Sequence, residues 1–349
     1  MKNLWKKFFI VLLSLIIVFS VTACSNSGGS NEGNSLPEEI NFGILRVPND
    51  ETIAIAENLF DKYFQNLGIT CNYIVFDSGR EANAALASGS IDFAAMGNTN
   101  AIIALATGLD VEMFWIDEVL GEIEALAVKN GSGIDELNDL VGNKVAVPFA
   151  STSHYILLKA LENAGIEDQV EILDMQTTEI VAAWERGDIQ AAYVWQPSLS
   201  VLLEDGKVLI SSEDMAKEGY ITANVKVVRK DFSKKYPDLV ADYIATLAEG
   251  GNIYRENAKN GAEIVAEELD ISSEDALMQM QGSIWCTPQE LLEESYFGTT
   301  SSAGNFATIM KDTADFLQEQ NSIDTSPSLE DFKEFVNPLY IEKYMETIE

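Results

Sequence analysis

Residues 145–161 read VAVPFASTSHYILLKAL. The stretch begins as a short apolar run typical of a buried strand, passes through a turn rich in hydroxyl groups, and ends in an apolar pattern of helical spacing. In such a unit the free N–H groups of the first helical turn and the nearby hydroxyls converge on one point. We therefore predict an anion site in this turn, with Phe149, Ser151 and Thr152 beside the ligand. The alternative is that a hydroxyl of the turn only caps the helix.

The same alternation of strand and helix continues on both sides of this stretch. Apolar runs interpreted as strands lie at residues 40–44, 71–76, 93–96, 111–116, 125–128, 144–147, 170–173, 191–194 and 225–228. Strands that alternate with helical patterns predict an α/β fold with parallel sheets, and a chain of 349 residues can bury two cores. After residue 228 only helical patterns follow, and we expect this segment to pack on an existing sheet.

The first residues differ from the rest of the chain. Three lysines, at positions 2, 6 and 7, precede an apolar run over residues 8–21 and the small residues before Cys24. This order predicts a signal peptide over residues 1–23, because the run is shorter than the roughly 20 residues that span a membrane. Residues 21–24, VTAC, resemble a bacterial lipobox with Val in place of Leu, which implies that Cys24 is lipidated and anchors an exported protein to the outer face of the cytoplasmic membrane. Ordinary cleavage nearby is the alternative.

Residues 24–36 are rich in Ser, Asn and Gly and predict a flexible linker. Charge excludes other functions. The formal net charge is −34, and removal of a leader with three lysines and no acids leaves 19 basic against 56 acidic residues, about −37. Nucleic acid is therefore not an expected partner, since phosphate binding needs a cationic surface.

Metal and cofactor motifs are absent from the sequence. His154 is the single histidine, and there is no CxxC or HExxH motif, so we expect no metal site. There is no P-loop GxxxxGK[ST] motif, so we expect no nucleotide hydrolysis and no cofactor. Cys71 and Cys286 are either free or bonded to each other.

Two further strand ends carry polar residues that open a helix. Gly97, Asn98 and Thr99 either contact a ligand, where glycine permits close backbone approach, or form a simple turn with a helix cap. Ser78 follows another strand in the same way and is a candidate ligand residue, with capping by Asp77 or Ser78 as the alternative.

The remaining candidates lie after the first strand and at the end of a later one. Arg46 and Asn49 come where such folds place a ligand loop, at the carboxyl edge of the sheet. Arg46 either pairs with an anion or is a solvated charge. Tyr193 and Trp195 point to the same side of a strand and either form an aromatic wall that packs the ligand or belong to the core.

Five stretches resemble the taurine-binding proteins of ABC sulfonate importers. They are residues 145–161, EIVAAWERGDIQAAYVWQPSL at 179–199, GKVL at 206–209, VVRKDF at 227–232, and FDSGREANAALASGSIDFAAMGN at 76–98. The resemblance extends from about residue 40 to residue 320, and its longest motifs are specific within that group.

This resemblance implies a two-lobed, periplasmic-binding-protein-like fold of type II with two hinge crossovers. Crossings near residues 125–128 and 225–228 assign residues 37–128 and 225–349 to the first lobe, with the helical C-terminal segment packed on it, and residues 129–224 to the second lobe. The implied protein is not an enzyme. It captures taurine or a related small sulfonate by lobe closure and delivers it to an ABC permease that works with a separate ATPase subunit.

The chain departs from these relatives where they carry an aspartate and a tryptophan before VVRKDF, because Asn224 and Lys226 stand there. Recognition of a primary ammonium at Asn224 is thereby weakened, and Glu124 is the candidate for a replacement carboxylate. Three more acids either compensate or belong to a solvated loop: Asp117, Glu118 and Glu122. The open alternatives are another zwitterion, an aminophosphonate or a carboxylate as ligand, or an enzyme or sensor on the same fold.

Overall fold

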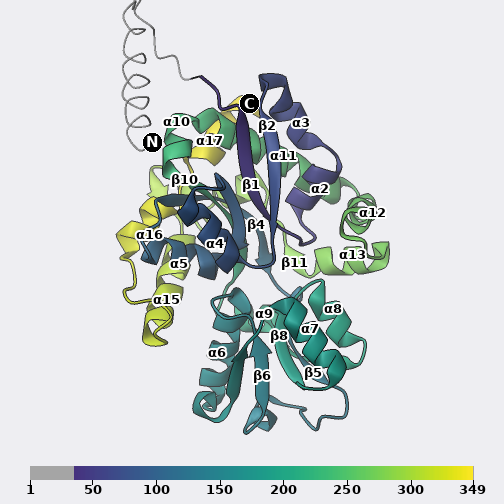
Figure 1. The fold of residues 1–349 in the computed structure, drawn as a ribbon. Coiled ribbons are helices and arrows are strands. Elements are labelled where there is room, and N and C mark those ends of the chain that lie inside the picture. Colours follow the sequence, from purple (N-terminus) through teal and green to yellow (C-terminus); the bar gives the residue numbers. More distant parts are fainter. Residues whose placement is uncertain (1–34, 349) are drawn as a thin grey trace, which may run out of the picture. The chain divides into compact units, whose positions relative to one another are not determined.

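The apolar runs of the sequence assemble into two main sheets, each flanked by helices (Figure 1). The computed structural model describes residues 35–348. The predicted signal peptide, Cys24 and residues 24–34 of the predicted linker lie outside the described residues. No helix within residues 35–348 combines the length and the apolar character that crossing a membrane requires.

The first lobe contains a six-stranded sheet in the order β11-β4-β10-β3-β1-β2. Its strands are β1 (Glu39–Leu45), β2 (Thr70–Phe76), β3 (Phe93–Gly97), β4 (Val111–Leu120), β10 (Ala223–Arg229) and β11 (Ser283–Ile284). β1 is parallel to β2 and β3, whereas β10 is antiparallel to β3 and β4. The prediction of parallel pairing is correct for the first three strands and wrong for β10, because β10 returns from the second sheet.

The second lobe contains a five-stranded sheet in the order β7-β6-β8-β5-β9. Its strands are β5 (Glu124–Lys129), β6 (Lys144–Val147), β7 (Glu171–Asp174), β8 (Ala191–Trp195) and β9 (Gly206–Ser211). β6 is parallel to β7 and β8, and β5 is antiparallel to β8 and β9. β9 was not predicted from the sequence because it is an edge strand with little burial: Val208 is 45% exposed.

The chain crosses between the sheets at different residues from those predicted. β5 pairs with β8 from Glu124 through Val128, so the whole strand belongs to the second lobe and the first crossing lies at residues 121–123. β10 pairs within the first sheet from Ala223, so the return crossing precedes it. At the first crossing, a Cβ on Gly121 would lie 2.5 Å from the carbonyl oxygen of Gly282, which requires glycine there.

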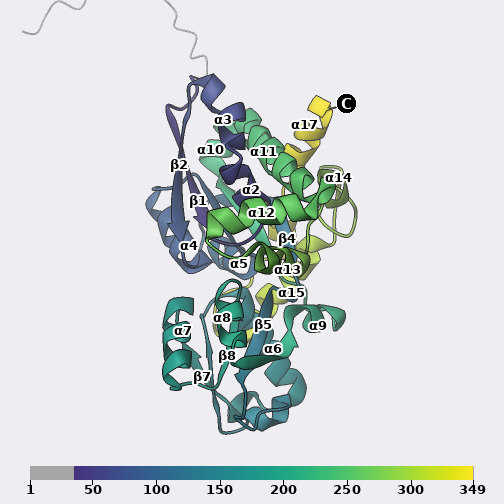
Figure 2. The ribbon, with the colours of Figure 1, turned by 90° about the vertical axis from the view of Figure 1, so that its right-hand side faces the viewer.

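The helices of the first lobe cover both faces of its sheet (Figure 2). They are α2 (Asp50–Ala56), α3 (Leu59–Tyr63), α4 (Gly79–Ser88), α5 (Asn98–Ala106), α10 (Lys230–Lys235), α11 (Pro237–Glu256), α12 (Ala258–Leu269), α13 (Ser273–Gln281), α14 (Pro288–Leu291), α15 (Phe306–Glu319), α16 (Leu329–Phe335) and α17 (Leu339–Ile348). α11 packs on α2, α3 and α17, and α16 and α17 pack on β4, so the predicted packing of the C-terminal helices on this lobe is confirmed.

One predicted helix is divided. The helical pattern over residues 52–65 forms α2 and α3, because Asn58 adopts a left-handed conformation with φ of 55°. The break turns Phe60 and Phe64 onto β1, where the rings of Phe60 and Phe42 lie 5.1 Å apart, edge to face. Tyr243 of α11 completes this aromatic cluster, with its ring 4.9 Å from that of Phe42.

The second sheet is covered on both faces as well. α6 (Thr152–Ala164) and α9 (Ser212–Lys217) lie on the face formed by Leu126 and Val128, and α7 (Thr177–Arg186) and α8 (Ser198–Leu203) on the face formed by Ala125 and Ala127. α9 was not expected from the sequence. Phe316 of α15 also packs here, against Tyr155 of α6 with ring centroids 5.5 Å apart, so one C-terminal helix touches both lobes.

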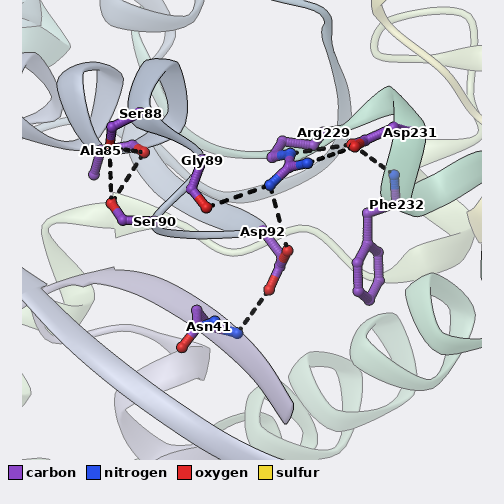
Figure 3. A network of polar contacts seen from close by, with 9 residues as sticks. All are labelled: Asn41, Ala85, Ser88, Gly89, Ser90, Asp92, Arg229, Asp231 and Phe232. Carbon is purple, nitrogen blue, oxygen red and sulfur yellow. Dashed lines mark hydrogen bonds and ion pairs between the residues drawn. The ribbon is translucent and has the colours of Figure 1, made fainter. Parts of the chain in front are cut away.

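A polar network connects the end of β10 with β1 (Figure 3). Arg229 pairs with Asp231 and donates to the carbonyl oxygen of Gly89 at 3.5 Å, and its Nη1 lies 3.8 Å from Oδ1 of Asp92. Oδ2 of Asp92 accepts the backbone N–H of Asn41 at 2.9 Å. Asp92 thus connects β1 with β10.

We predict that Asp92→Ala lowers the free energy of unfolding by about 1–3 kcal/mol, because the substitution leaves the N–H of Asn41 without an acceptor. Urea unfolding measures the change. Asp110→Ala is the matched control, since Asp110 is exposed beside β4, and it should shift the free energy by no more than about 0.5 kcal/mol. Equal effects of the two substitutions would contradict this account of the network.

Candidate ligand-binding site

The carboxyl ends of strands from both sheets surround a cavity. Its volume, measured as the space open to the centre of a water molecule, is about 30 Å³, and it is partly open to solvent. Eight of the predicted ligand-binding residues line it: Ser78, Gly97, Glu124, Phe149, Ser151, Thr152, Trp195 and Asn224. These residues lie far apart in the sequence and come from both lobes.

Nine further residues line the same cavity and were not among the predicted ligand-binding residues. They are Leu45, Val47, Gly79, Arg80, Asn100, Leu120, Ile123, Ala150 and Gln196. Gly79, Arg80 and Asn100 belong to the same two turns as Ser78 and Thr99, so the sequence located the turns but did not separate the side chains that line the cavity from those that do not. The apolar members carry no signal that separates a cavity wall from a core.

Arg46 and Asn49 do not line the cavity. Arg46 is exposed, and its guanidinium donates to the carbonyl oxygen of Glu268 at 3.3 Å. Asn49 is buried and caps α2, where its side chain accepts the backbone N–H of Thr52 at 3.1 Å. The loop after β1 instead contributes Val47 to the wall.

Asn98, Thr99 and Tyr193 are also absent from the lining, because all three point into protein. Asn98 accepts the backbone N–H of Ala223 at 3.2 Å, which attaches α5 to β10. Thr99 is fully buried. Tyr193 is fully buried too, with its hydroxyl 3.2 Å from that of Ser212, and so belongs to the core of the second lobe.

The start of α6 already holds a carboxylate, that of Glu124. The hydroxyls of Thr152 and Ser153 donate to Oε1 of Glu124 at 2.5 and 2.7 Å, and the hydroxyl of Ser212 donates to Oε2 at 2.6 Å. Burial raises the pKa of Glu124, and these hydroxyl donors offset part of that effect. The Thr152 hydroxyl is therefore engaged within the protein rather than left unused for a ligand.

Ser151 caps α6, as the alternative interpretation held. Its hydroxyl donates to the carbonyl oxygen of Pro148 at 2.6 Å and accepts the backbone N–H of His154 at 3.1 Å. The imidazole of His154 stacks on Phe149, with ring centroids 4.3 Å apart. Burial lowers the pKa of His154 to about 4, so this imidazole is neutral at pH 7.

Three helix starts border the cavity, each with the partial positive charge of its free N–H groups. The lining residues that belong to these starts are Ser78, Gly79 and Arg80 at α4, Gly97 and Asn100 at α5, and Ser151 and Thr152 at α6. Ser78 is 6% exposed, and its hydroxyl has no hydrogen-bond partner among the described residues. The start of α4 therefore offers an unused hydroxyl donor, with the cation of Arg80 on the same cavity wall.

A cluster of charged residues is buried beside the cavity. Asp117 and Glu118 lie in β4 and are 1% and 0% exposed, so the solvated-loop interpretation is wrong for both, whereas Glu122 is exposed. Lys226 is fully buried, with its Nζ 2.7 Å from Glu51 and 3.2 Å from Asp117. Lys226, one of the two residues at which the chain departs from the taurine-binding proteins, thus acts as the counter-charge of buried carboxyl groups.

The two lobes touch around the cavity. Nδ2 of Asn100 donates to the carbonyl oxygen of Ala150 at 2.6 Å, and Nη1 of Arg80 lies 3.1 Å from Oδ2 of Asp174. A Cβ placed on Gly97 would lie only 2.7 Å from Cγ2 of Thr152. This approach of β3 to α6 leaves room for no side chain at position 97.

Groups suited to metal binding or thiol chemistry do not gather at the cavity. Within residues 35–348, no three His, Cys, Asp or Glu side chains are arranged to hold a metal ion. Cys71 and Cys286 are both free thiols. Neither thiol lines the cavity.

Sequence comparison relates the chain to known binding proteins. Residues 44–260 match the family model described as the substrate binding domain of the ABC-type glycine betaine transport system. The taurine-binding periplasmic protein of Escherichia coli (strain K12) is 35% identical over 297 residues, which cover 83% of this chain and 88% of that protein. A putative aliphatic sulfonates-binding protein of Bacillus subtilis (strain 168) is 25% identical over 346 residues, 98% of this chain and 97% of that protein.

Comparison of structures gives the same fold. The periplasmic aliphatic sulphonate binding protein of Escherichia coli superposes with a TM-score of 0.69 at 20% identity, covering 86% of this chain and 99% of that one. A desulfurization enzyme superposes with a TM-score of 0.65 at 15% identity, covering 90% and 100%, so the fold alone does not separate binding from catalysis. The family is identified by sequence, through the family model that matches residues 44–260 and the 35% identity to the taurine-binding protein. This chain belongs to the family of ABC-type substrate-binding domains that the model describes.

Proposed function

We propose that this protein captures taurine or a related small sulfonate between its lobes and delivers it to the permease of an ABC importer, which a separate ATPase subunit drives. One observation carries the proposal: helix starts from both lobes border a single cavity, and a buried hydroxyl there, that of Ser78, has no partner among the described residues. The taurine-binding and sulfonate-binding relatives support the same class of ligand.

The sulfonate binds at the start of α4 in this proposal. Ser78 supplies a hydroxyl and the first turn supplies N–H groups. Arg80, which also pairs with Asp174 of the other lobe, adds positive charge on the same wall. This differs from the site expected from the sequence, where the α6 hydroxyls were the donors, because Glu124 occupies the hydroxyls of Thr152 and Ser153. Phe149 and Trp195 pack the methylene groups of the ligand.

Lobe closure accompanies capture. A ligand that contacts both lobes stabilises the closed state by the interactions that only this state makes. The contact of Asn100 with Ala150 joins the lobes at the cavity, and Phe316 of α15 joins them away from it. The closed, loaded protein is then the form that docks on the permease.

The reactive side chains of the chain favour binding over turnover. Burial raises the pKa of Cys71 to about 11 and also raises the pKa of Cys286, so both thiols remain protonated at pH 7 and are poor nucleophiles. His154 is held against Phe149, and its pKa of about 4 makes it a weak base. These features support a carrier rather than an enzyme.

We predict that purified protein binds taurine in calorimetry and that Ser78→Ala weakens this binding about 10- to 100-fold, since a hydrogen bond to a charged group contributes about 1.5–3 kcal/mol. Ser90→Ala, at an exposed serine after α4, is the control and should leave the affinity unchanged. Alkanesulfonates, an aminophosphonate and small carboxylates complete the panel. Binding of sugars or peptides alone would refute the proposal.

We predict that Gly97→Ala hinders lobe closure. Its Cβ would overlap Cγ2 of Thr152 where the lobes meet in this structure, at a cost of about 1–3 kcal/mol, so taurine affinity should fall about 5- to 100-fold if binding requires this approach of the lobes. Alanine is compatible with the φ of −63° at this position, so the melting temperature without ligand should change little. The double variant Gly97→Ala/Thr152→Ser removes the overlapping methyl and should regain affinity, and failure of this rescue would count against closure.

We also propose that the protein is exported and anchored by a lipid on Cys24, with residues 24–36 as the tether that keeps it near the permease. Cys24→Ser should move the protein from the membrane fraction to the soluble exported fraction, and radiolabelled palmitate should no longer be incorporated. The taurine affinity of the released protein should be unchanged. Retention of the variant on the membrane would contradict lipid anchoring at this residue.

A further inference from the structure

Glu118 is the third residue of a row that crosses the first sheet beside the cavity. Asn224 of β10 pairs with Gly97 of β3 on one side and with Glu118 of β4 on the other. Directly paired residues of antiparallel strands point to the same face of the sheet. Gly97 and Asn224 both line the cavity, and so does Leu120, two residues beyond Glu118 on the same strand. Glu118 therefore lies on the cavity side of the sheet, directly behind Asn224.

One oxygen of this carboxyl group lacks a partner. Oε1 of Glu118 accepts Nδ2 of Asn224 at 2.5 Å, whereas Oε2 has no hydrogen-bond partner among the described residues. Glu118 is 0% exposed, so Oε2 has no water surface to compensate. A buried acceptor without a donor costs about 1–3 kcal/mol, and a proton on the carboxyl group or a nearby cation offsets this cost. Because Asn224 donates its amide hydrogen to Glu118, the carbonyl oxygen of the same amide is the part left to accept from the cavity side.

Among the described residues, Glu118 and its surroundings hold four buried acids and one buried cation, that of Lys226. A bulge in β4 inserts Asp117 between the residues that pair with Asn224 and Val225, and so sets two acids side by side. α2 adds Asp50 and Glu51 to the cluster. Three further groups from neighbouring elements complete it: Lys226 pairs with Glu51 and Asp117, Trp115 donates to Asp50 at 3.1 Å, and Tyr243 donates to Glu51.

All four acids are at most 3% exposed and face one lysine, so with every acid ionised the cluster would carry three uncompensated negative charges. Buried charges persist only when they are paired or neutralised by protons. A cationic group brought next to this cluster therefore favours the ionised form of an acid that otherwise holds a proton, whereas a purely anionic ligand does not. The start of α4, with Ser78 and Arg80, remains the place for the sulfonate.

We propose that the carbonyl oxygen of Asn224 receives the ammonium group of the ligand and that Glu118 behind it supplies the negative charge, so that the site selects amino-substituted sulfonates over plain alkanesulfonates. This inference rests on the proposed function and assigns the cationic half of the same ligand. Asn224 contacts the ligand directly, and Glu118 is the specificity-determining carboxylate behind it.

Proton linkage follows from this assignment. Burial and the neighbouring Asp117 raise the pKa of Glu118 to about 8, against the effects of Asn224, Lys226 and Asn49, and burial raises the pKa of Asp50 to about 7. In the empty site at pH 7, Glu118 therefore holds a proton. An ammonium group favours the ionised carboxylate, so binding releases this proton and affinity rises with pH up to about 8. The limiting slope for one proton is about tenfold per pH unit.

The test compares taurine with propane-1-sulfonate, in which a methyl group replaces the ammonium group. Calorimetry on the whole protein should show that taurine binds at least about 10-fold more tightly. Glu118→Gln should remove most of this preference by weakening taurine binding about 10-fold or more, without weakening propane-1-sulfonate. Glu122→Gln, at the exposed acid two residues beyond Leu120, is the matched control and should keep the wild-type preference.

Titration of the wild-type protein at pH 7 in two buffers of different ionisation enthalpy counts the protons released. About one proton per taurine is expected, and none for propane-1-sulfonate, and this readout requires no variant to fold. Equal affinity of the wild-type protein for both sulfonates, unchanged taurine binding by Glu118→Gln, or no proton release overturns the inference and leaves sulfonate capture intact. Binding of neither sulfonate refutes the proposed function itself.

Discussion

The carboxylate of Glu124 joins the parts of the second lobe that face the cavity. It is the first residue of β5, and it accepts hydroxyls from the first turn of α6 and from Ser212 at the start of α9. A fully buried carboxylate is stable only with such donors, so strand and helices are held in one arrangement. Because Glu124 lies directly after the crossing at residues 121–123, the same interaction fixes the cavity wall next to the hinge.

In the first lobe, the buried acids are only partly provided with hydrogen-bond donors and counter-charges. Lys226 neutralises part of a group of buried acids, but one oxygen of Glu118 keeps no partner among the described residues. A satisfied carboxylate at Glu124 and an unsatisfied one at Glu118 therefore differ in what they can do. Glu124 holds β5, α6 and α9 together. Glu118 keeps one oxygen without a partner among the described residues, next to Asn224 at the wall of the proposed ligand site.

The hydroxyl groups at the helix starts around the cavity differ in whether the protein itself already uses them. The hydroxyls of Ser151 and Thr152 looked from the sequence like ligand donors, yet one caps α6 and the other donates to Glu124. Ser78 was expected either to contact a ligand or to cap its helix, and it stands at the N-cap position of α4 with its hydroxyl unused among the described residues. Sequence spacing locates donors at a helix start, but it does not reveal which of them the protein itself consumes, because the competing acceptor comes from a distant strand.

The sequence by itself determined the α/β class, the positions of most strands, and the strand ends at which polar residues gather, because periodicity and turn chemistry are local properties of the chain. Its resemblance to the taurine-binding proteins implied the two lobes. Only the tertiary structure decided that β5 lies wholly in the second sheet, that β10 runs antiparallel, and that Asp117 and Glu118 are buried. These outcomes depend on which strands become neighbours. Strand pairing, burial and the partner of each charge are set by residues distant in sequence, and no local pattern specifies them.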